Sequence, residues 1–118
     1  MLFRNEQGRW VIDAANTRLL ANIGMVSGAV WSDLDGDGTP ELILACEWGP
    51  IRIFRNNAGK LLPWDPPVTL DARRSTLHAP PSTLNAPRST LHDFTGLWSG
   101  ITTGDIDGDG LPDLLVSY

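Results

Sequence analysis

Two short acidic loops carry the side chains in this chain that are best suited to chemistry. Loop 1 is residues 33–41, which read DLDGDGTPE, and loop 2 is residues 105–113, which read DIDGDGLPD. In both loops carboxylates stand at positions 1, 3, 5 and 9, and glycines stand at positions 4 and 6. Four like charges so close in sequence repel one another, and a folded loop of this kind needs a cation among them.

The donor atoms of both loops are oxygens, since neither loop contains cysteine or histidine. Hard oxygen ligands favour a hard cation, and we predict one Ca²⁺ per loop. Positions 1, 3, 5 and 9 would supply carboxylates, and the backbone carbonyl of position 7 a further oxygen. The glycine at position 6 permits a sharp turn, and the apolar side chains at positions 2 and 10 would anchor the loop to the core. The predicted ligands are Asp33, Asp35, Asp37, Thr39 and Glu41 in loop 1, and Asp105, Asp107, Asp109, Leu111 and Asp113 in loop 2.

Helical calcium-binding modules fit the sequence of these loops less well. An EF-hand needs a glutamate at position 12, where this chain has Leu44 and Val116, and helices on both sides. A dockerin-like module would also need helices after the loops, and a pair of metal-free acidic turns does not explain two copies with identical spacing. An enzyme is the alternative class, but the chain has no nucleophile elbow and no HExxH motif.

Composition limits the remaining classes. The chain has 118 residues, 42% hydrophobic and 19% charged, which is enough for one small folded domain. The formal charge of −5 is mostly a property of the loops, which hold eight of the fourteen acidic residues. The nine basic residues form no stripe, which argues against nucleic-acid binding, and no apolar run could span a membrane. The single cysteine, Cys46, lies in an apolar run and is expected to be a buried side chain.

The chain repeats itself at two offsets. Residues 2–5 (LFRN) reappear as residues 53–56 (IFRN) with an offset of 51, and residues 24–46 match residues 96–118 with an offset of 72. The difference of 21 residues equals three tandem copies of a seven-residue unit at residues 74–94. We interpret this tract as an insertion into a repeat of about 51 residues, and as an extended loop, because its prolines break helices. The two histidines, His78 and His92, belong to these copies.

The segments beside the loops are short, apolar or β-branched, and bounded by turn residues, which predicts strands. Asn5–Gly8 and Asn56–Gly59 are predicted hairpin turns. A helical turn is expected only within residues 13–21, and the fold class is therefore all-β. The predicted strands are residues 9–12, 27–31, 42–46, 51–55, 60–62, 100–103 and 114–118.

The pattern Ser-Gly-x4-Asp-x-Asp-Gly-Asp-Gly-x-Pro-(Glu/Asp)-Leu occurs at residues 27–42 and 99–114. It resembles FG-GAP/VCBS repeats, the blade units of integrin-α-type β-propellers, and the Phe-Arg-Asn hairpins resemble the cartilage-acidic-protein and UnbV-type subgroup. The resemblance covers nearly the whole chain except residues 74–94. It implies that the loop acids bind Ca²⁺. Glu41 departs from the usual aspartate at position 9.

The resemblance implies about two antiparallel, four-stranded blades of a β-propeller, at about residues 1–51 and 52–118. Two blades cannot close a ring, so we expect either the rest of a larger propeller or a homo-oligomer to complete it. The expected function is a non-catalytic, calcium-stabilised binding or adhesion scaffold; the alternative is a propeller enzyme whose catalytic residues lie outside this chain. A protein or carbohydrate is the expected ligand, with Trp48 the best candidate for an exposed stacking ring. The family implies an extracytoplasmic location, although the chain shows no signal peptide.

Overall fold

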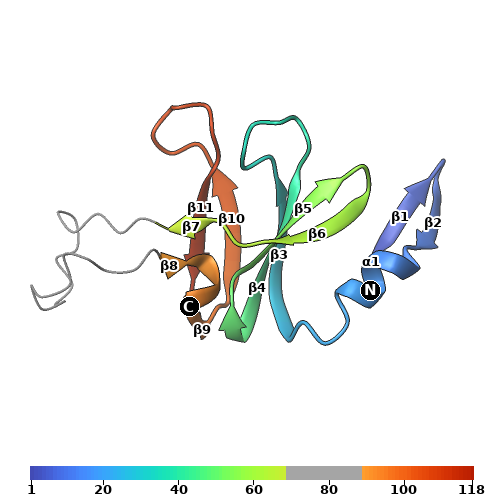
Figure 1. Ribbon diagram of the computed structural model, residues 1–118, viewed down its shortest axis with the longest axis horizontal. Helices are drawn as coiled ribbons and strands as arrows, with labels where there is room; N and C mark the ends of the chain where they lie inside the picture. The colour runs from blue at the N-terminus through green and yellow to red at the C-terminus, as the bar shows by residue number, and fades with distance from the viewer. Residues whose placement is uncertain (69–88) are drawn as a thin grey trace, which may run out of the picture.

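The structure, a computed structural model, describes residues 1–68 and 89–118. Its described residues are mostly antiparallel strands with almost no helix, which confirms the all-β class (Figure 1). The strands are β1 (Phe3–Glu6), β2 (Arg9–Ile12), β3 (Met25–Ser32), β4 (Glu41–Pro50), β5 (Arg52–Asn57), β6 (Lys60–Trp64), β7 (Pro67–Val68), β8 (Ser89–Thr90), β9 (Thr95–Leu97), β10 (Gly100–Gly104) and β11 (Asp113–Ser117). The helical segments are α1 (Ala14–Leu19) and the 3₁₀ turn η1 (Leu91–Asp93).

The central sheet runs in the order β3-β4-β5-β6, each strand antiparallel to its neighbour. Loop 1 connects β3 to β4, where Ser32 pairs with Glu41. The far end of β4 pairs with β9 through a bulge at residues 47–49. These four strands form one antiparallel sheet, and β9 adds a fifth strand to it, in agreement with the all-β class.

A two-stranded hairpin lies on each side of the central sheet (Figure 1). β1–β2 is the repeat equivalent of β5–β6, and β10–β11, with loop 2 between its strands, is the equivalent of β3–β4. The central sheet covers residues 25–64 and so crosses the expected blade boundary at residues 51 and 52. The hydrogen-bonded sheet therefore begins about half a repeat later than the expected repeat unit. The length of a sequence repeat does not determine at which strand a sheet begins.

β4 is covered on both faces, and each of its first six residues is buried. One hydrophobic cluster, the α1-side cluster, is formed by Leu42, Leu44, Cys46, Phe54 and Leu61, with Leu20 and Ile23 packed against it. The second, the β10-side cluster, is centred on Ile43, Ile51 and Ile53 and includes Ile101, Leu114 and Val116 from the β10–β11 hairpin. The alternation of β4 between two clusters explains its continuous apolar sequence.

The β10–β11 hairpin approaches the central sheet closely at Gly28 of β3. A Cβ atom at Gly28 would lie 2.9 Å from the Cγ2 atom of Ile101, so a larger residue would push the two sheets apart. The hydroxyl of Ser27 donates to the carbonyl of Trp98, and the indole Nε1 of Trp98 donates to the carbonyl of Gly49 at 3.1 Å. These contacts join neighbouring sheets through side chains rather than through a strand ladder.

Helix α1 attaches to the central sheet through Asn16. Asp13 caps the helix by accepting from the backbone N–H of Asn16 at 3.0 Å, and this hydrogen bond lowers the pKa of Asp13. The side-chain amide of Asn16 donates to the carbonyl of Gly59 at 2.7 Å, and its oxygen accepts from the N–H of Leu61 at 2.9 Å. Asn16 is 4% exposed, so these bonds are shielded from water.

The predicted strands and the helical turn within residues 13–21 are confirmed, but the expectation of helix only there is wrong, because η1 forms a 3₁₀ turn at Leu91–Asp93. Residues Gln7, Gly8, Ala58 and Gly59 have positive φ, as two-residue hairpin turns require. Of the expected extended loop at residues 74–94, residues 74–88, with His78, lie outside the described residues, and residues 89–94 contain β8 and η1. Cys46 is buried as expected, and Trp48 is 80% exposed at the bulge of β4.

Replacing Asn16 with alanine is expected to lower the free energy of unfolding by about 1–3 kcal/mol, because the N–H of Leu61 and the carbonyl of Gly59 lose their buried partner. Chemical denaturation followed by tryptophan fluorescence measures the change. Asn57→Ala, at an exposed position of the same β-hairpin, is the control. Equal effects of the two substitutions would contradict the role assigned to Asn16.

Candidate metal centre

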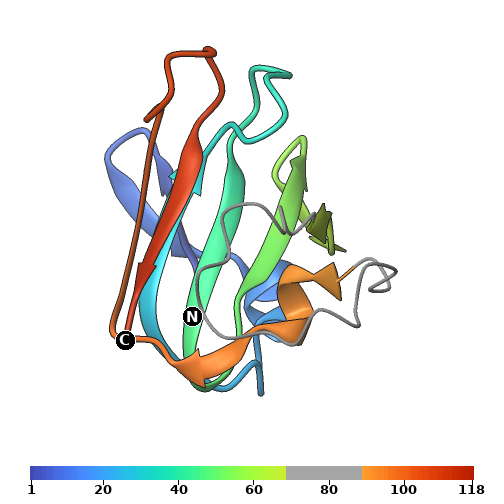
Figure 2. The same ribbon diagram turned by 90° about the vertical axis from the view of Figure 1, so that its left-hand side faces the viewer.

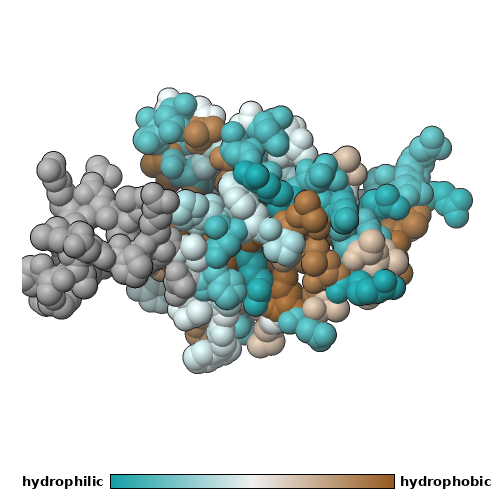
Figure 3. All heavy atoms as spheres, viewed as in Figure 1, coloured by the Kyte–Doolittle hydropathy of each residue, from teal (hydrophilic) through white to brown (hydrophobic). Residues whose placement is uncertain are grey.

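The two acidic loops lie at the same end of their sheets. Figures 1 and 2 show loop 1 above β3 and β4 and loop 2 above β10 and β11, side by side in both views. Hydrophilic residues gather at this end of the molecule in the space-filling view (Figure 3). The two loops therefore lie at equivalent positions of adjacent sheets, as the sequence repeat predicts.

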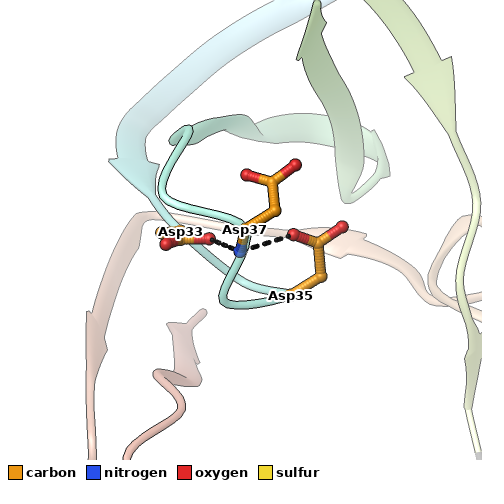
Figure 4. A group of neighbouring side chains, drawn as sticks. All are labelled: Asp33, Asp35 and Asp37. Atoms are coloured by element: carbon orange, nitrogen blue, oxygen red, sulfur yellow. Dashed lines mark hydrogen bonds between the residues drawn. The ribbon is translucent and has the colours of Figure 1, made fainter.

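Position 1 organises the backbone of loop 1. The two carboxylate oxygens of Asp33 accept from the N–H groups of Gly36 at 2.9 Å, Asp37 at 3.0 Å and Gly38 at 2.8 Å. This arrangement needs positive φ at both glycines, with φ of 76° at Gly36 and 86° at Gly38. Asp35 accepts from the N–H of Asp37 at 3.3 Å (Figure 4).

Loop 2 repeats this arrangement nearly bond for bond. Asp105 accepts from Gly108 at 2.7 Å and Gly110 at 3.0 Å, and Asp107 accepts from the N–H of Asp109 at 3.2 Å. Both glycines again have positive φ. Two sequences that differ at three of nine positions thus adopt the same turn.

Position 9 links the end of each loop to its beginning. The carboxylate of Glu41 accepts from the N–H of Leu34 at 2.8 Å, and that of Asp113 accepts from the N–H of Ile106 at 2.7 Å. Glu41 is only 1% exposed, and its pKa is raised, first by burial and then by the charges of Asp35, Asp37 and Asp33. The longer side chain of Glu41 therefore fills the same role as the aspartate of loop 2, in a drier environment.

Three carboxylates in each loop come together closely enough to share one ion. Oxygens of Asp33, Asp35 and Asp37 lie within 4.8 Å of one another in loop 1 (Figure 4). In loop 2 the corresponding group is Asp105, Asp107 and Asp113. Glu41 and Asp109, the remaining predicted carboxylate ligands, are not in these groups.

The other predicted positions have mixed outcomes. Thr39 and Leu111 at position 7 donate their backbone N–H groups to Asp37 and Asp109 at 2.7 and 2.8 Å, and their role as carbonyl ligands stays a prediction. Leu34 packs against the β10-side cluster, as an anchor should. Its equivalent Ile106 is 75% exposed, so the expected anchoring of loop 2 at position 2 is wrong. The β10–β11 hairpin packs against β3 and β4 of the central sheet.

Sequence reasoning missed one residue at loop 1. Arg55 of β5 forms an ion pair with Asp35, with Nη2 2.9 Å from Oδ2. A concavity of about 360 Å³ lies between loop 1 and the β5–β6 hairpin, and its lining includes Asp37, Glu41 and Arg55. The Phe-Arg-Asn repeat marked Arg55 as part of a hairpin, but its approach to loop 1 depends on the pairing of β4 with β5.

A second concavity, of about 330 Å³, opens beside the start of β5. Its lining combines apolar side chains with Arg52, Asp65 and His92. The Nε atom of Arg52 is buried without a hydrogen-bond partner. Trp64 of β6 lines the same concavity.

The comparison with known families agrees with this geometry. Residues 97–118 match the family model of the FG-GAP repeat, a segment that contains β10, loop 2 and β11. The chain thus carries an FG-GAP repeat, within an all-β arrangement of propeller-type blade units. No curated protein and no solved structure matched the chain. Among the described residues, no helix is both long and apolar enough to cross a bilayer.

Proposed function

We propose that this chain is a calcium-stabilised, non-catalytic segment of a β-propeller that serves as a binding or adhesion scaffold. The observation that carries the proposal is the near-identical hydrogen bonding of two acidic loops at the same end of adjacent sheets, one of them within an FG-GAP repeat. A single acidic turn would be ordinary surface chemistry. Two turns with the same spacing, the same glycine conformations and the same hydrogen bonds are better explained if each loop binds the same kind of ligand.

The residues in hand fit a calcium ion. Each loop offers three carboxylates whose oxygens lie within 4.8 Å of one another, and all these donors are oxygens. At loop 1 the buried carboxyl group of Glu41 lies beside Asp33, Asp35 and Asp37, and burial together with their charges raises its pKa. A bound divalent cation would neutralise this concentration of charge.

The chain's own residues determine what such an ion would do. Asp33 holds three loop N–H groups, and Glu41 holds the N–H of Leu34 at the point where β4 begins. Cross-linking these carboxylates would connect the end of β3 to the start of β4, and the same holds for β10 and β11. The role assigned to both ions is structural, and the predicted ligand sets remain those given by the sequence.

Removal of calcium is expected to lower the melting temperature, because the carboxylates of each loop then repel one another. At calcium concentrations about a hundredfold above Kd, the difference from protein in excess EDTA should be roughly 10 °C or more. Differential scanning calorimetry measures both states, with magnesium at the same concentration as the control. Identical melting curves with calcium and with EDTA would refute the stabilising role.

Combining Asp35→Ala with Asp107→Ala should abolish calcium binding, since each substitution removes one of the clustered carboxylates of its loop. Isothermal titration calorimetry should show two sites in the unaltered chain and none in the double variant. Glu6→Ala, at an exposed acid of β1 outside both loops, is the control and should keep both sites. Two sites remaining in the double variant would show that calcium binds elsewhere.

We also propose that a partner strand pairs with the free edge of β11. In the central sheet β4 pairs with β5 on the edge away from β3, whereas β11 pairs only with β10 among the described strands. We propose that further strands, from the rest of a larger propeller or from a second copy, complete this blade. Light scattering after size-exclusion chromatography should show residues 1–118 alone as an oligomer or as an aggregating species. A stable, monodisperse monomer would count against this completion.

The ligand and the location follow from the same proposal. A protein or a carbohydrate would bind on a face of the propeller, where exposed Trp48 and the cleft beside Arg52 are candidate contacts. No nucleic acid is proposed. The FG-GAP family is typically extracellular, and millimolar external calcium suits shallow, exposed loops, so we propose an extracytoplasmic location.

A further inference from the structure

We infer that Arg55 is a tethered counter-ion of loop 1, which occupies Asp35 in the absence of calcium and weakens the binding of calcium at this loop. The inference rests on the proposed calcium binding and adds a form of regulation to it. Loop 1 would bind calcium more weakly than the same loop without Arg55, because the ion must compete with the guanidinium group of Arg55 on β5 for Asp35.

The first support is that both oxygens of Asp35 are engaged. Oδ1 accepts from the N–H of Asp37 at 3.3 Å, and Oδ2 lies 2.9 Å from Nη2 of Arg55. Asp35 also belongs to the group of three carboxylates that would share the ion. A calcium ion that uses Oδ2 must therefore displace the guanidinium or share the oxygen with it.

The second support is that Arg55 is held in place from the other side. Its guanidinium carbon lies 4.2 Å from the ring centroid of Trp64 on β6. Arg55 pairs with Leu62 and Trp64 pairs with Ile53, so the two side chains are diagonal neighbours on one face of the sheet. Trp64 packs against the β10-side cluster, which gives the arginine a fixed platform.

The third support is the contrast with loop 2. Asp107 accepts from the N–H of Asp109 at 3.2 Å, much as Asp35 does, but no ion pair involves loop 2 within residues 1–68 and 89–118. The repeat equivalent of Arg55 is Arg4, which pairs instead with Glu6 and Asp13. Within the described residues, loop 1 therefore has a paired arginine from β5, whereas no described strand occupies the corresponding position beside β11.

The tethered charge has opposite effects on the two states of loop 1. Without calcium, Arg55 offsets part of the repulsion among Asp33, Asp35 and Asp37 and stabilises the loop. With calcium, the same guanidinium opposes the ion. Arg55 is 51% exposed and Asp35 27% exposed, so solvent screens the pair and limits the effect to about threefold to fivefold in affinity.

The test isolates each loop in the full chain. Asp107→Ala leaves loop 1 as the intact site, and Asp35→Ala leaves loop 2. Adding Arg55→Gln to the first protein should tighten calcium binding about threefold to fivefold by calorimetry. Adding it to the second should leave affinity unchanged. In EDTA, Arg55→Gln should lower the melting temperature, while the rise on adding calcium should become larger.

Arg4→Gln is the matched control, because it removes the same charge at the equivalent repeat position far from loop 1 in sequence and outside its contacts. Arg55→Lys keeps the charge, so in the loop 1 protein it should stay closer to the unaltered affinity than Arg55→Gln does. Calcium binding by both single-loop proteins with no tightening by Arg55→Gln, or equal tightening by Arg4→Gln, overturns this inference and leaves the proposed function standing. No calcium binding by either single-loop protein overturns both.

Discussion

Like-charge repulsion at the junction between the first two strands of each blade is the constraint on which the rest of this structure depends. Carboxylate oxygens within 4.8 Å of one another repel by about 1 kcal/mol per pair in water and by several kcal/mol in a less polar environment. The loops reduce this cost with backbone N–H donors, three of which converge on Asp33. At loop 1 the ion pair of Arg55, on β5, with Asp35 reduces the repulsion further.

The position of loop 1 makes this repulsion matter for the core. β4 begins at Glu41 and continues directly into the residues that form both hydrophobic clusters. A disturbed loop would therefore misplace the strand that is buried on both faces. Asn16 and Trp98 secure the same sheet at other points, the first through the β5–β6 hairpin and the second through Gly49. The acidic loops and the packing of the core are therefore parts of one arrangement.

The sequence predicted the local structure well because local rules govern it. Alternation, turn glycines and loop spacing located the strands, the hairpins and the clustered carboxylates of both loops. Long-range pairing decided the rest. The phase of the sheet, the pairing of β9 with β4 and the approach of Arg55 to Asp35 all join residues distant in sequence. The exposure of Ile106 was missed because an apolar residue is buried only where a neighbouring sheet covers it.

The offset of about half a repeat between the sheet and the sequence repeat has a genetic consequence. A DNA event that adds or removes one whole period rejoins equivalent half-sheets, so the array can change its number of blades without leaving an unmatched strand inside it. An event of any other length would have to fall between sheets to be tolerated. The three seven-residue copies at positions 74–94 begin after the fourth strand of the central sheet and end before β9. Copies at this place lengthen the chain between β6 and β9 and lie outside strands β3, β4, β5 and β6 of the central sheet.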